Sequence, residues 1–153
     1  MKFSEIINPS QIVLDLKAID RWMTIEELVD ILVTKSCIEE SRRGTVIQAV
    51  KSREKTMSTG IGFGIAIPHA STDAITKVTA ILARSSHGIN FDSLDNQPVK
   101  LVVLFLVPTG QYQQHLKTLA SISRFLNDRG FREQAEQAKT AEELYQLIVR
   151  REQ

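Results

Sequence analysis

A histidine lies directly after a proline near the end of a glycine-rich apolar segment, STGIGFGIAIPHA, at residues 58–70. Pro68 fixes its own backbone φ and biases the preceding residue toward an extended conformation, so the chain reaches His69 with little local freedom. A neutral imidazole is a competent nucleophile near pH 7. His69 could therefore act as a nucleophile that takes up a transferred group such as a phosphoryl group, although a single histidine more often has a structural or surface role.

Glycines alternate at positions 60, 62 and 64 of the same segment. Glycine adopts φ values that other residues avoid, and exposed loop amides can hold an anion. The spacing excludes the common nucleotide loops, because the Walker pattern ends in Gly-Lys-Ser/Thr and the dinucleotide fingerprint is G-x-G-x-x-G before a helix. The alternative interpretation is a bulged strand or a turn.

Four further side chains could act on the same group. Arg53 continues the apolar face of a predicted helix, where its guanidinium could clamp a phosphoryl group or, alternatively, complement the helix C-terminus. His115 is predicted on the apolar side of a later helix, where it could steady the first imidazole, donate to a phosphoryl oxygen or hold a backbone carbonyl. The hydroxyls of Ser58 and Thr59 could donate to the same oxygens or serve the turn.

Other chemistries have less support in the sequence. A metal site would need a third ligand, and neither HExxH nor a Cys/His pattern is present. Asp73, four residues after His69, is predicted to be a solvated loop carboxylate. A Ser-His-Asp hydrolase would need the nucleophile elbow G-x-S-x-G, which the chain lacks. We therefore predict that no metal and no other cofactor is needed.

Composition limits the class of protein. The chain has 153 residues, 42% of them hydrophobic, and a formal net charge of +1, which predicts one globular domain over residues 1–153. The absence of a basic cluster predicts no nucleic-acid partner. A single cysteine favours a reducing compartment, the N-terminus has no secretory signal, and the longest apolar run is too short to span a membrane. We expect a cytoplasmic protein that is not inserted in a membrane.

The elements that must position His69 alternate between strands and helices. Apolar patterns predict strands at 11–16, 77–84 and 99–107, the last buried on both faces. Helices are predicted from a capping box at Thr24–Glu27 to Ser36, over 41–54, over 112–127, and after a second capping box at Thr140–Glu143. Turns are predicted at 85–88, with His87 in solvent, and at 95–98. The alternation predicts an α/β fold with one sheet covered by helices.

The segment SREKTMSTGIGFGIAIPHA resembles the signature of the fructose/mannitol-type enzyme IIA domain of the bacterial phosphoenolpyruvate-dependent phosphotransferase system. The similarity continues through NQPVKLVVLFLVP (96–108), HLKTLASISRFLND (115–128) and AKTAEELYQLI (138–148), and so covers essentially the whole chain. The NQPV turn and the opening MKFSEIINPSQIVLDL look most like nitrogen-regulatory members of that family. The resemblance implies a single mixed β-sheet packed between α-helices.

The resemblance also implies a role for each matching position. His69 aligns with the histidine that accepts the phosphoryl group, His115 with a supporting histidine and Arg53 with the arginine beside the phosphohistidine. Ser58 and Thr59 lie in the same pocket segment. The implied donor is a histidine phosphocarrier protein. The implied partners are regulatory target proteins or, for a sugar-transport subunit, a IIB component.

Two positions depart from the family pattern. Ala70 stands where glycine is usual after the active histidine, and Phe63 stands where a polar residue is common. Neither removes a catalytic group, but both leave the identity of the partner open. A binding module in which His69 is never phosphorylated is the alternative from another class, and the joint presence of His69, Arg53 and His115 argues against it. A small-molecule hydrolase is a more distant alternative.

Overall fold

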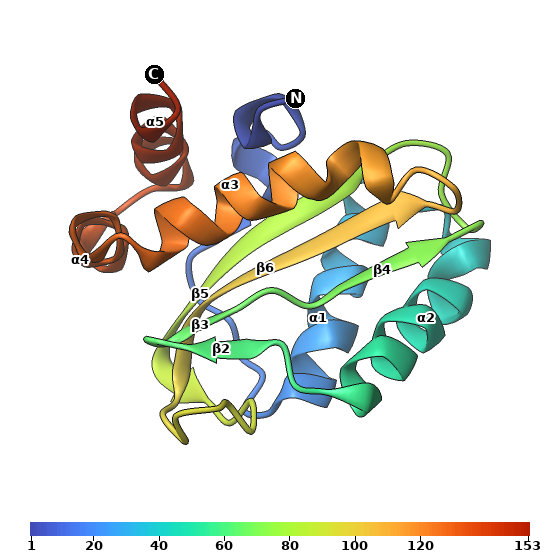
Figure 1. Ribbon diagram of the computed structural model, residues 1–153, viewed down its shortest axis with the longest axis horizontal. Coiled ribbons are helices and arrows are strands. Elements are labelled where there is room, and N and C mark those ends of the chain that lie inside the picture. Colours follow the sequence, from blue (N-terminus) through green and yellow to red (C-terminus); the bar gives the residue numbers. More distant parts are fainter.

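One mixed β-sheet lies between two layers of helices in the computed structural model, which describes residues 1–153 (Figure 1). The strands run in the order β1-β5-β6-β3-β2, and β4 also pairs with β6. β5 and β6 are antiparallel to each other. β1 pairs with β5 in parallel, and β3 and β4 both pair with β6 in parallel. The strands are β1 (Ile12–Val13), β2 (Gly60–Gly62), β3 (Ile65–Ala66), β4 (His69–Thr72), β5 (Thr79–Ile89) and β6 (Val99–Pro108). The predicted fold class is confirmed.

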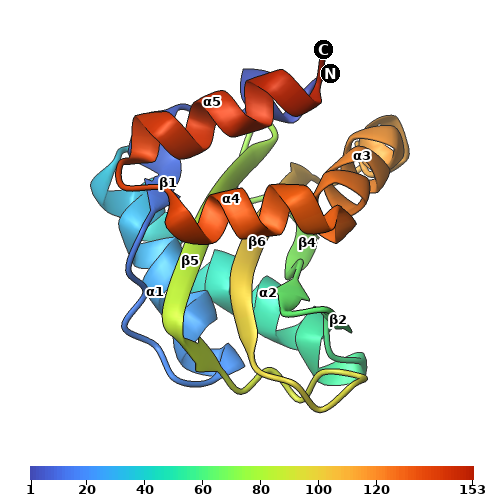
Figure 2. The same cartoon turned by 90° about the vertical axis from the view of Figure 1, so that its left-hand side faces the viewer.

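Two helices cover one face of the sheet and three cover the other (Figures 1 and 2). The first pair is α1 (Arg21–Thr34) and α2 (Arg43–Thr56), and the second group is α3 (Leu116–Asn127), α4 (Arg129–Gln137) and α5 (Ala141–Arg151). Short 3₁₀ turns precede or join them: η1 (Phe3–Glu5), η2 (Pro9–Gln11), η3 (Glu40–Arg42) and η4 (Gln113–His115). None of the helices is both long and apolar enough to cross a membrane.

Strand β6 divides the core into two clusters, as its continuous apolar sequence predicts. Leu101, Val103, Phe105 and Val107 belong to the cluster that includes residues of α3, α4 and α5. Val102, Leu104 and Leu106 belong to the cluster that includes residues of α1 and α2. Successive side chains of a strand point to opposite faces, so a strand that is buried on both faces needs apolar residues at every position.

Strands β3 and β4 are two pieces of one line that pairs with β6. Ile65 lies opposite Leu101, and His69 lies opposite Phe105. Between the pieces, Pro68 has no amide hydrogen to donate, but its carbonyl accepts a hydrogen bond from the amide of Phe105 at 3.0 Å. His69 is therefore the first residue of β4, directly after a break that the proline imposes.

The predicted start of the first helix at Thr24 is wrong by about one turn. Asp20 is the N-cap, and its carboxylate accepts from the amide of Met23 at 2.8 Å. The Thr24 hydroxyl instead donates back to the carbonyl of Asp20, and the Glu27 carboxylate accepts from the amide of Ala18 in the preceding segment. An aspartate is as good an N-cap as threonine, so the earlier residue with this property begins the helix.

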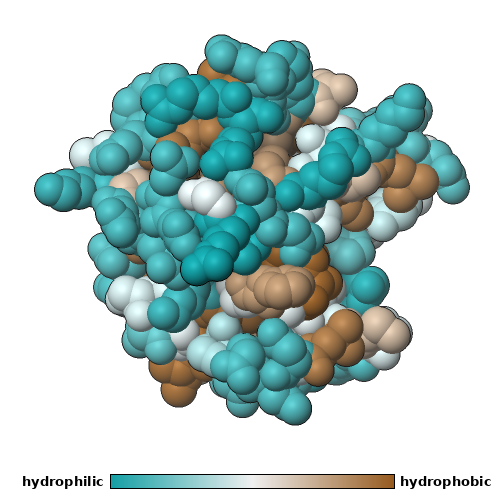
Figure 3. Space-filling view, turned by 60° about the vertical axis from the view of Figure 1, so that its left-hand side comes forward, coloured by the Kyte–Doolittle hydropathy of each residue, from teal (hydrophilic) through white to brown (hydrophobic).

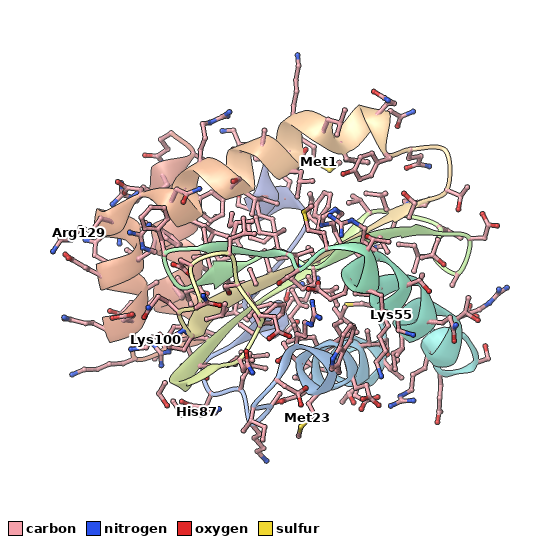
Figure 4. The ribbon with its side chains drawn as sticks, turned by 60° about the horizontal axis from the view of Figure 1, so that its bottom comes forward. Met1, Met23, Lys55, His87, Lys100 and Arg129 are labelled. Atoms are coloured by element: carbon pink, nitrogen blue, oxygen red, sulfur yellow. The ribbon has the colours of Figure 1, made fainter.

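The predicted turn at 85–88 is also wrong, because β5 continues through it to Ile89. The register between β5 and β6 shifts between Arg84 and Ile89, and Gly88 adopts a φ of +84°. The Ser and Gly residues thus form an irregularity within a strand rather than a turn. His87 is exposed, as predicted, and lies near the end of the sheet remote from α3 (Figure 4).

Candidate functional site

A pocket of about 370 Å³ lies between the end of α2, the glycine-rich segment and α3. Four of the predicted site residues line it: Arg53, Ser58 and Thr59 from the segment that joins α2 to β2, and His69. The lining residues are Arg53, Met57, Ser58, Thr59, Ile61, Ile67, His69, Leu94, Leu116, Leu119, Ala120 and Ser123. None of them is acidic, and Arg53 is the one permanent cation, so the pocket is suited to an anion.

The ring of His69 has a defined tautomer. Its Nδ1 lies 2.7 Å from the carbonyl oxygen of Ile67. A carbonyl oxygen can only accept, so Nδ1 carries the hydrogen and donates it. In a neutral imidazole the other nitrogen then has a free lone pair, which makes Nε2 of His69 the nucleophilic atom.

The surroundings of His69 favour the neutral ring. Burial lowers its pKa below the ordinary value of 6.5, and the nearby Arg53 guanidinium lowers it further. The hydrogen bond to Ile67 and the Glu54 carboxylate act in the opposite direction but do not reverse the shift. The imidazole is therefore deprotonated, and able to act as a nucleophile, at neutral pH.

This shift predicts the pH dependence of both titration and stability. The midpoint of His69 in the folded protein is expected below 6.5, measured from imidazole carbon-bound proton shifts by NMR. Since the folded protein binds this proton more weakly than the unfolded chain, the contribution of His69 to stability is complete above pH 6.5 and is lost as the pH falls through the folded-state pKa. A midpoint at or above 6.5 would contradict the buried, Arg53-facing environment.

Arg53 lies in the last turn of α2, a position compatible with both of its predicted roles, binding an anion and complementing the helix C-terminus. One guanidinium nitrogen, Nη1, donates to the carbonyl of Met57 at 3.0 Å and lies 3.4 Å from the Thr56 hydroxyl. It therefore complements the C-terminus of the helix, as its position in the last turn allows. The same side chain lines the pocket beside His69, so it is placed to contact an anion there.

Ser58 and Thr59 line the pocket, but their hydroxyls are engaged within the protein. Ser58 donates to the carbonyl of Phe91 and accepts from the amide of Gly60 at 3.1 Å. The buried Thr59 donates to the Glu54 carboxylate at 2.6 Å. Both hydroxyls hold the loop in place, and their donation to a phosphoryl oxygen stays a prediction.

Glu54 is the residue of the site that the sequence analysis missed. Its side chain is fully buried, accepts from the amide of Thr59 at 2.9 Å, and pairs with the Arg21 guanidinium at 3.2 Å. Through these contacts Glu54, a residue of α2, holds the loop that precedes β2 in place and links α2 to α1. A signal was available, because Val46, Val50 and Glu54 follow at four-residue spacing, which places Glu54 on the buried face of the helix.

His115 packs against Phe105, the strand neighbour of His69. It lies in η4, and its ring meets Phe105 edge-on, with centroids 6.3 Å apart. Phe105 is the partner of His69 across β4 and β6. No hydrogen bond joins the two histidines, and the buried Nδ1 of His115 has no hydrogen-bond partner. The supporting role of His115 stays a prediction.

Gly60 is required where the glycine-rich segment meets the loop after β5. A Cβ at this position would lie 2.3 Å from the hydroxyl oxygen of Ser93 and 3.2 Å from the Cβ of Phe91. We expect Gly60→Ala to lower the free energy of unfolding by about 1–3 kcal/mol, as overpacking does in a tight site. Gly44→Ala, where a Cβ would meet nothing within 4 Å, is the matched control. Equal urea midpoints for the two variants would contradict the close approach.

Exposed apolar side chains surround the opening of this pocket. Met57, Ile61, Leu94 and Leu116 all line it, and all are exposed despite being apolar. The space-filling view likewise shows hydrophobic residues interrupting a mainly hydrophilic surface (Figure 3). An apolar rim of this kind is typical of a surface that docks another protein.

The two departures from the family pattern have different environments. Ala70 is buried in the cluster beneath α1 and α2, on the opposite face of the sheet from the pocket. Phe63 is exposed at the tip between β2 and β3, with φ at +58°, and the Arg132 guanidinium lies 5.4 Å from its ring centroid. Neither residue lines the pocket.

The structure contains no group of three or more His, Cys, Asp or Glu side chains that could hold a metal ion. In particular, the exposed Asp73 does not join His69 in such a group.

The fold and the site together define an enzyme IIA-type α/β protein, a class whose solved members have this architecture. The chain belongs to the family described as phosphoenolpyruvate-dependent sugar phosphotransferase system, EIIA 2, which matches residues 5–150. The family named by the sequence resemblance is thus confirmed.

Relatives of two kinds are similar to this chain. A fructose-specific EIIA component of Haloferax volcanii is 39% identical over 128 residues, which cover 82% of each chain. A nitrogen regulatory protein of Bradyrhizobium diazoefficiens is 30% identical over 149 residues, 97% of this chain and 95% of the relative. The crystal structure of nitrogen regulatory protein IIA-Ntr from Neisseria meningitidis superimposes with a TM-score of 0.86 at 30% identity, covering 95% of this chain and 97% of that one.

Proposed function

We propose that this protein accepts a phosphoryl group on Nε2 of His69 from a histidine phosphocarrier protein, and that it regulates partner proteins according to its phosphorylation state. One observation carries the proposal. The Nδ1–H of His69 donates to the carbonyl oxygen of Ile67, which lies 2.7 Å from Nδ1, so the free lone pair lies on Nε2, in a pocket whose one permanent cation is Arg53.

The transfer step exchanges one P–N bond for another. The lone pair of Nε2 attacks phosphorus in line with the donor's nitrogen, and the electron pair of the broken bond stays on that nitrogen. The Nδ1–H of His69 stays hydrogen-bonded to the Ile67 carbonyl, and this hydrogen bond stabilises the positive charge that develops on the ring. The guanidinium of Arg53 stabilises charge on the phosphoryl oxygens. His115 would support the site from its place beside Phe105.

Regulation follows from the size of the charge change. Phosphorylation replaces a neutral ring by a group that carries roughly two negative charges. The surrounding rim, Met57, Ile61, Leu94 and Leu116, is apolar, so a partner that packs on it would respond strongly to the change. We infer that the protein acts in the cytoplasm as a single domain, residues 1–153.

A second function is supported by the fructose-specific relative, which is 39% identical to this chain. The protein would then pass the phosphoryl group to a IIB component, which would phosphorylate an incoming sugar. Both functions share the first transfer, and they differ in the acceptor.

Intact mass spectrometry after incubation with phosphoenolpyruvate, enzyme I and a histidine phosphocarrier tests the shared step. We expect one added phosphoryl group on the wild type, lost in acid, and none on His69→Ala. His87→Ala, which replaces an exposed histidine at the other end of the sheet, should accept the group normally. No added mass on the wild type with active donors would reject the proposal. Onward transfer to a purified IIB would favour sugar transport over regulation.

A further inference from the structure

Tyr112 packs against His69, and neither the sequence pattern nor the chemistry above uses it. The two ring centroids are 6.3 Å apart and the ring planes differ by 24°. This is an offset stack within the range at which aromatic rings attract each other. Tyr112 is half-buried and also packs against the core cluster beneath α3. The tyrosine ring is thus supported on the core side while it contacts the imidazole.

The turn that follows Tyr112 carries His115 on the same side. The amide of His115 donates to the carbonyl of Tyr112 at 3.1 Å, and η4 is a 3₁₀ turn. In such a turn the side chains of residues three apart eclipse each other. Tyr112 therefore contacts His69 while His115 contacts Phe105, which is the strand neighbour of His69.

Two different contacts then restrain the imidazole of His69. The hydrogen bond from Nδ1 to Ile67 acts in the plane of the ring, and the stack with Tyr112 acts on its face. Rotation about the Cβ–Cγ bond would break both contacts. The direction in which Nε2 points is consequently fixed before any donor arrives, which is the kind of preorganisation that phosphoryl transfer requires.

We propose that Tyr112 is a positioning residue for the phosphoryl acceptor. Its ring helps hold the imidazole of His69 in the orientation that presents Nε2, and it shields part of that imidazole from water before and after phosphorylation. This inference rests on the proposed function of His69, but its first consequence, a less hydrated imidazole, concerns the unphosphorylated protein alone.

The influence of the charged groups on the pKa of His69 can be distinguished from the influence of Tyr112. Arg53 and Glu54 approach from α2, with opposite influence on the pKa of His69. His115 and Tyr112 belong to the turn before α3, and the facing residue of β6 is the uncharged Phe105. A substitution at Tyr112 leaves the other groups in place, so a change in the titration of His69 reports on the tyrosine ring.

The test compares Tyr112→Ala, Tyr112→Phe and the control Gln114→Ala, which alters an exposed residue of the same turn. We expect NMR titration of unphosphorylated Tyr112→Ala to show the His69 pKa raised by about 0.5 unit, because part of the desolvation is lost. Tyr112→Phe keeps the stacking ring and should titrate like the wild type, as should Gln114→Ala. A second readout is the lifetime of the phosphorylated protein, expected to fall about threefold in Tyr112→Ala alone, as water reaches the P–N bond.

Unchanged titration and lifetime in a folded Tyr112→Ala would overturn the proposal, as would equal shifts in all three variants. If Tyr112→Ala does not fold, Tyr112→Leu keeps apolar bulk without a flat ring, and the same rise relative to Tyr112→Phe is expected. The two proposals fail separately. A wild type that accepts no phosphoryl group removes the proposed function, whereas a pKa insensitive to the tyrosine ring removes only the role of Tyr112.

Discussion

Glu54→Ala is expected to lower the free energy of unfolding by about 3–5 kcal/mol, the usual cost of removing one partner from a buried ion pair. The Glu54 side chain is fully buried and the Arg21 side chain is 16% exposed, with their charged atoms 3.2 Å apart. Alanine would also leave the amide and hydroxyl of Thr59 without an acceptor. Each buried polar group left unsatisfied adds its own desolvation cost.

Urea denaturation followed by circular dichroism measures this effect. Glu26→Ala is the matched control, because Glu26 pairs with Lys51 at the same distance, 3.2 Å, but is 45% exposed. An exposed pair contributes about 0–1 kcal/mol, so the control should change stability little. If the two variants were equally stable, Glu54 would not be the residue that fastens the loop to α1 and α2.

Arg53→Ala is expected to slow phosphoryl transfer to His69 about 100- to 1000-fold, the cost of removing one preorganised group that stabilises transition-state charge. Arg53 is the one permanent cation in the pocket lining, so no other side chain there can replace it. Its hydrogen bonds to Thr56 and Met57 lie at exposed positions, and stability should change little. Arg53→Lys should recover only part of the rate, because an ammonium cannot form a bidentate contact.

Rapid-quench measurement of transfer from a phosphorylated carrier protein gives this rate. Lys55→Ala is the control, because Lys55 is an exposed cation two residues further along α2 (Figure 4). Transfer to Arg53→Ala at the rate of Lys55→Ala would show that the guanidinium does not act on the phosphoryl group.

Patterns that depend on neighbouring residues in the sequence predicted much of the fold. The apolar run at Val99–Val107 correctly indicated a strand buried on both faces, because such a strand has no polar alternation. The N-cap of the second predicted capping box was also correct, but the reciprocal bond from the Glu143 side chain to the Thr140 amide is not formed. Thr140 accepts from the amide of Glu143, and the Glu143 carboxylate accepts from the amide of Lys139. These signals lie within a few residues of one another.

Features that depend on distant contacts were not predicted. Helix α4 begins at an aspartate N-cap, Asp128, and buries only Phe131 and Ala135 over nine residues, so its apolar stripe is too short to be distinctive. The continuation of β5 past Arg84 is fixed by pairing with β6, which the local Ser and Gly content does not reveal.

For the site, the family resemblance predicted that Arg53 lies beside His69, and both residues line one pocket in the structure. The contacts that define their chemistry could not be predicted. The choice of Nε2 depends on a carbonyl two residues earlier, and the restraint on the ring depends on Tyr112, which lies 43 positions along the chain but stacks on His69. The first depends on the local backbone conformation on either side of Pro68, and the second depends on the tertiary structure.

The position of the phosphoryl group on the imidazole ring decides whether His69 acts through Nε2. After phosphorylation, ¹⁵N-edited NMR of the histidine rings distinguishes Nε2 from Nδ1 and identifies the residue. We expect phosphorus on Nε2 of His69, with Nδ1 still protonated and hydrogen-bonded to the Ile67 carbonyl. Phosphorus on Nδ1 of His69, or on another histidine, would contradict it.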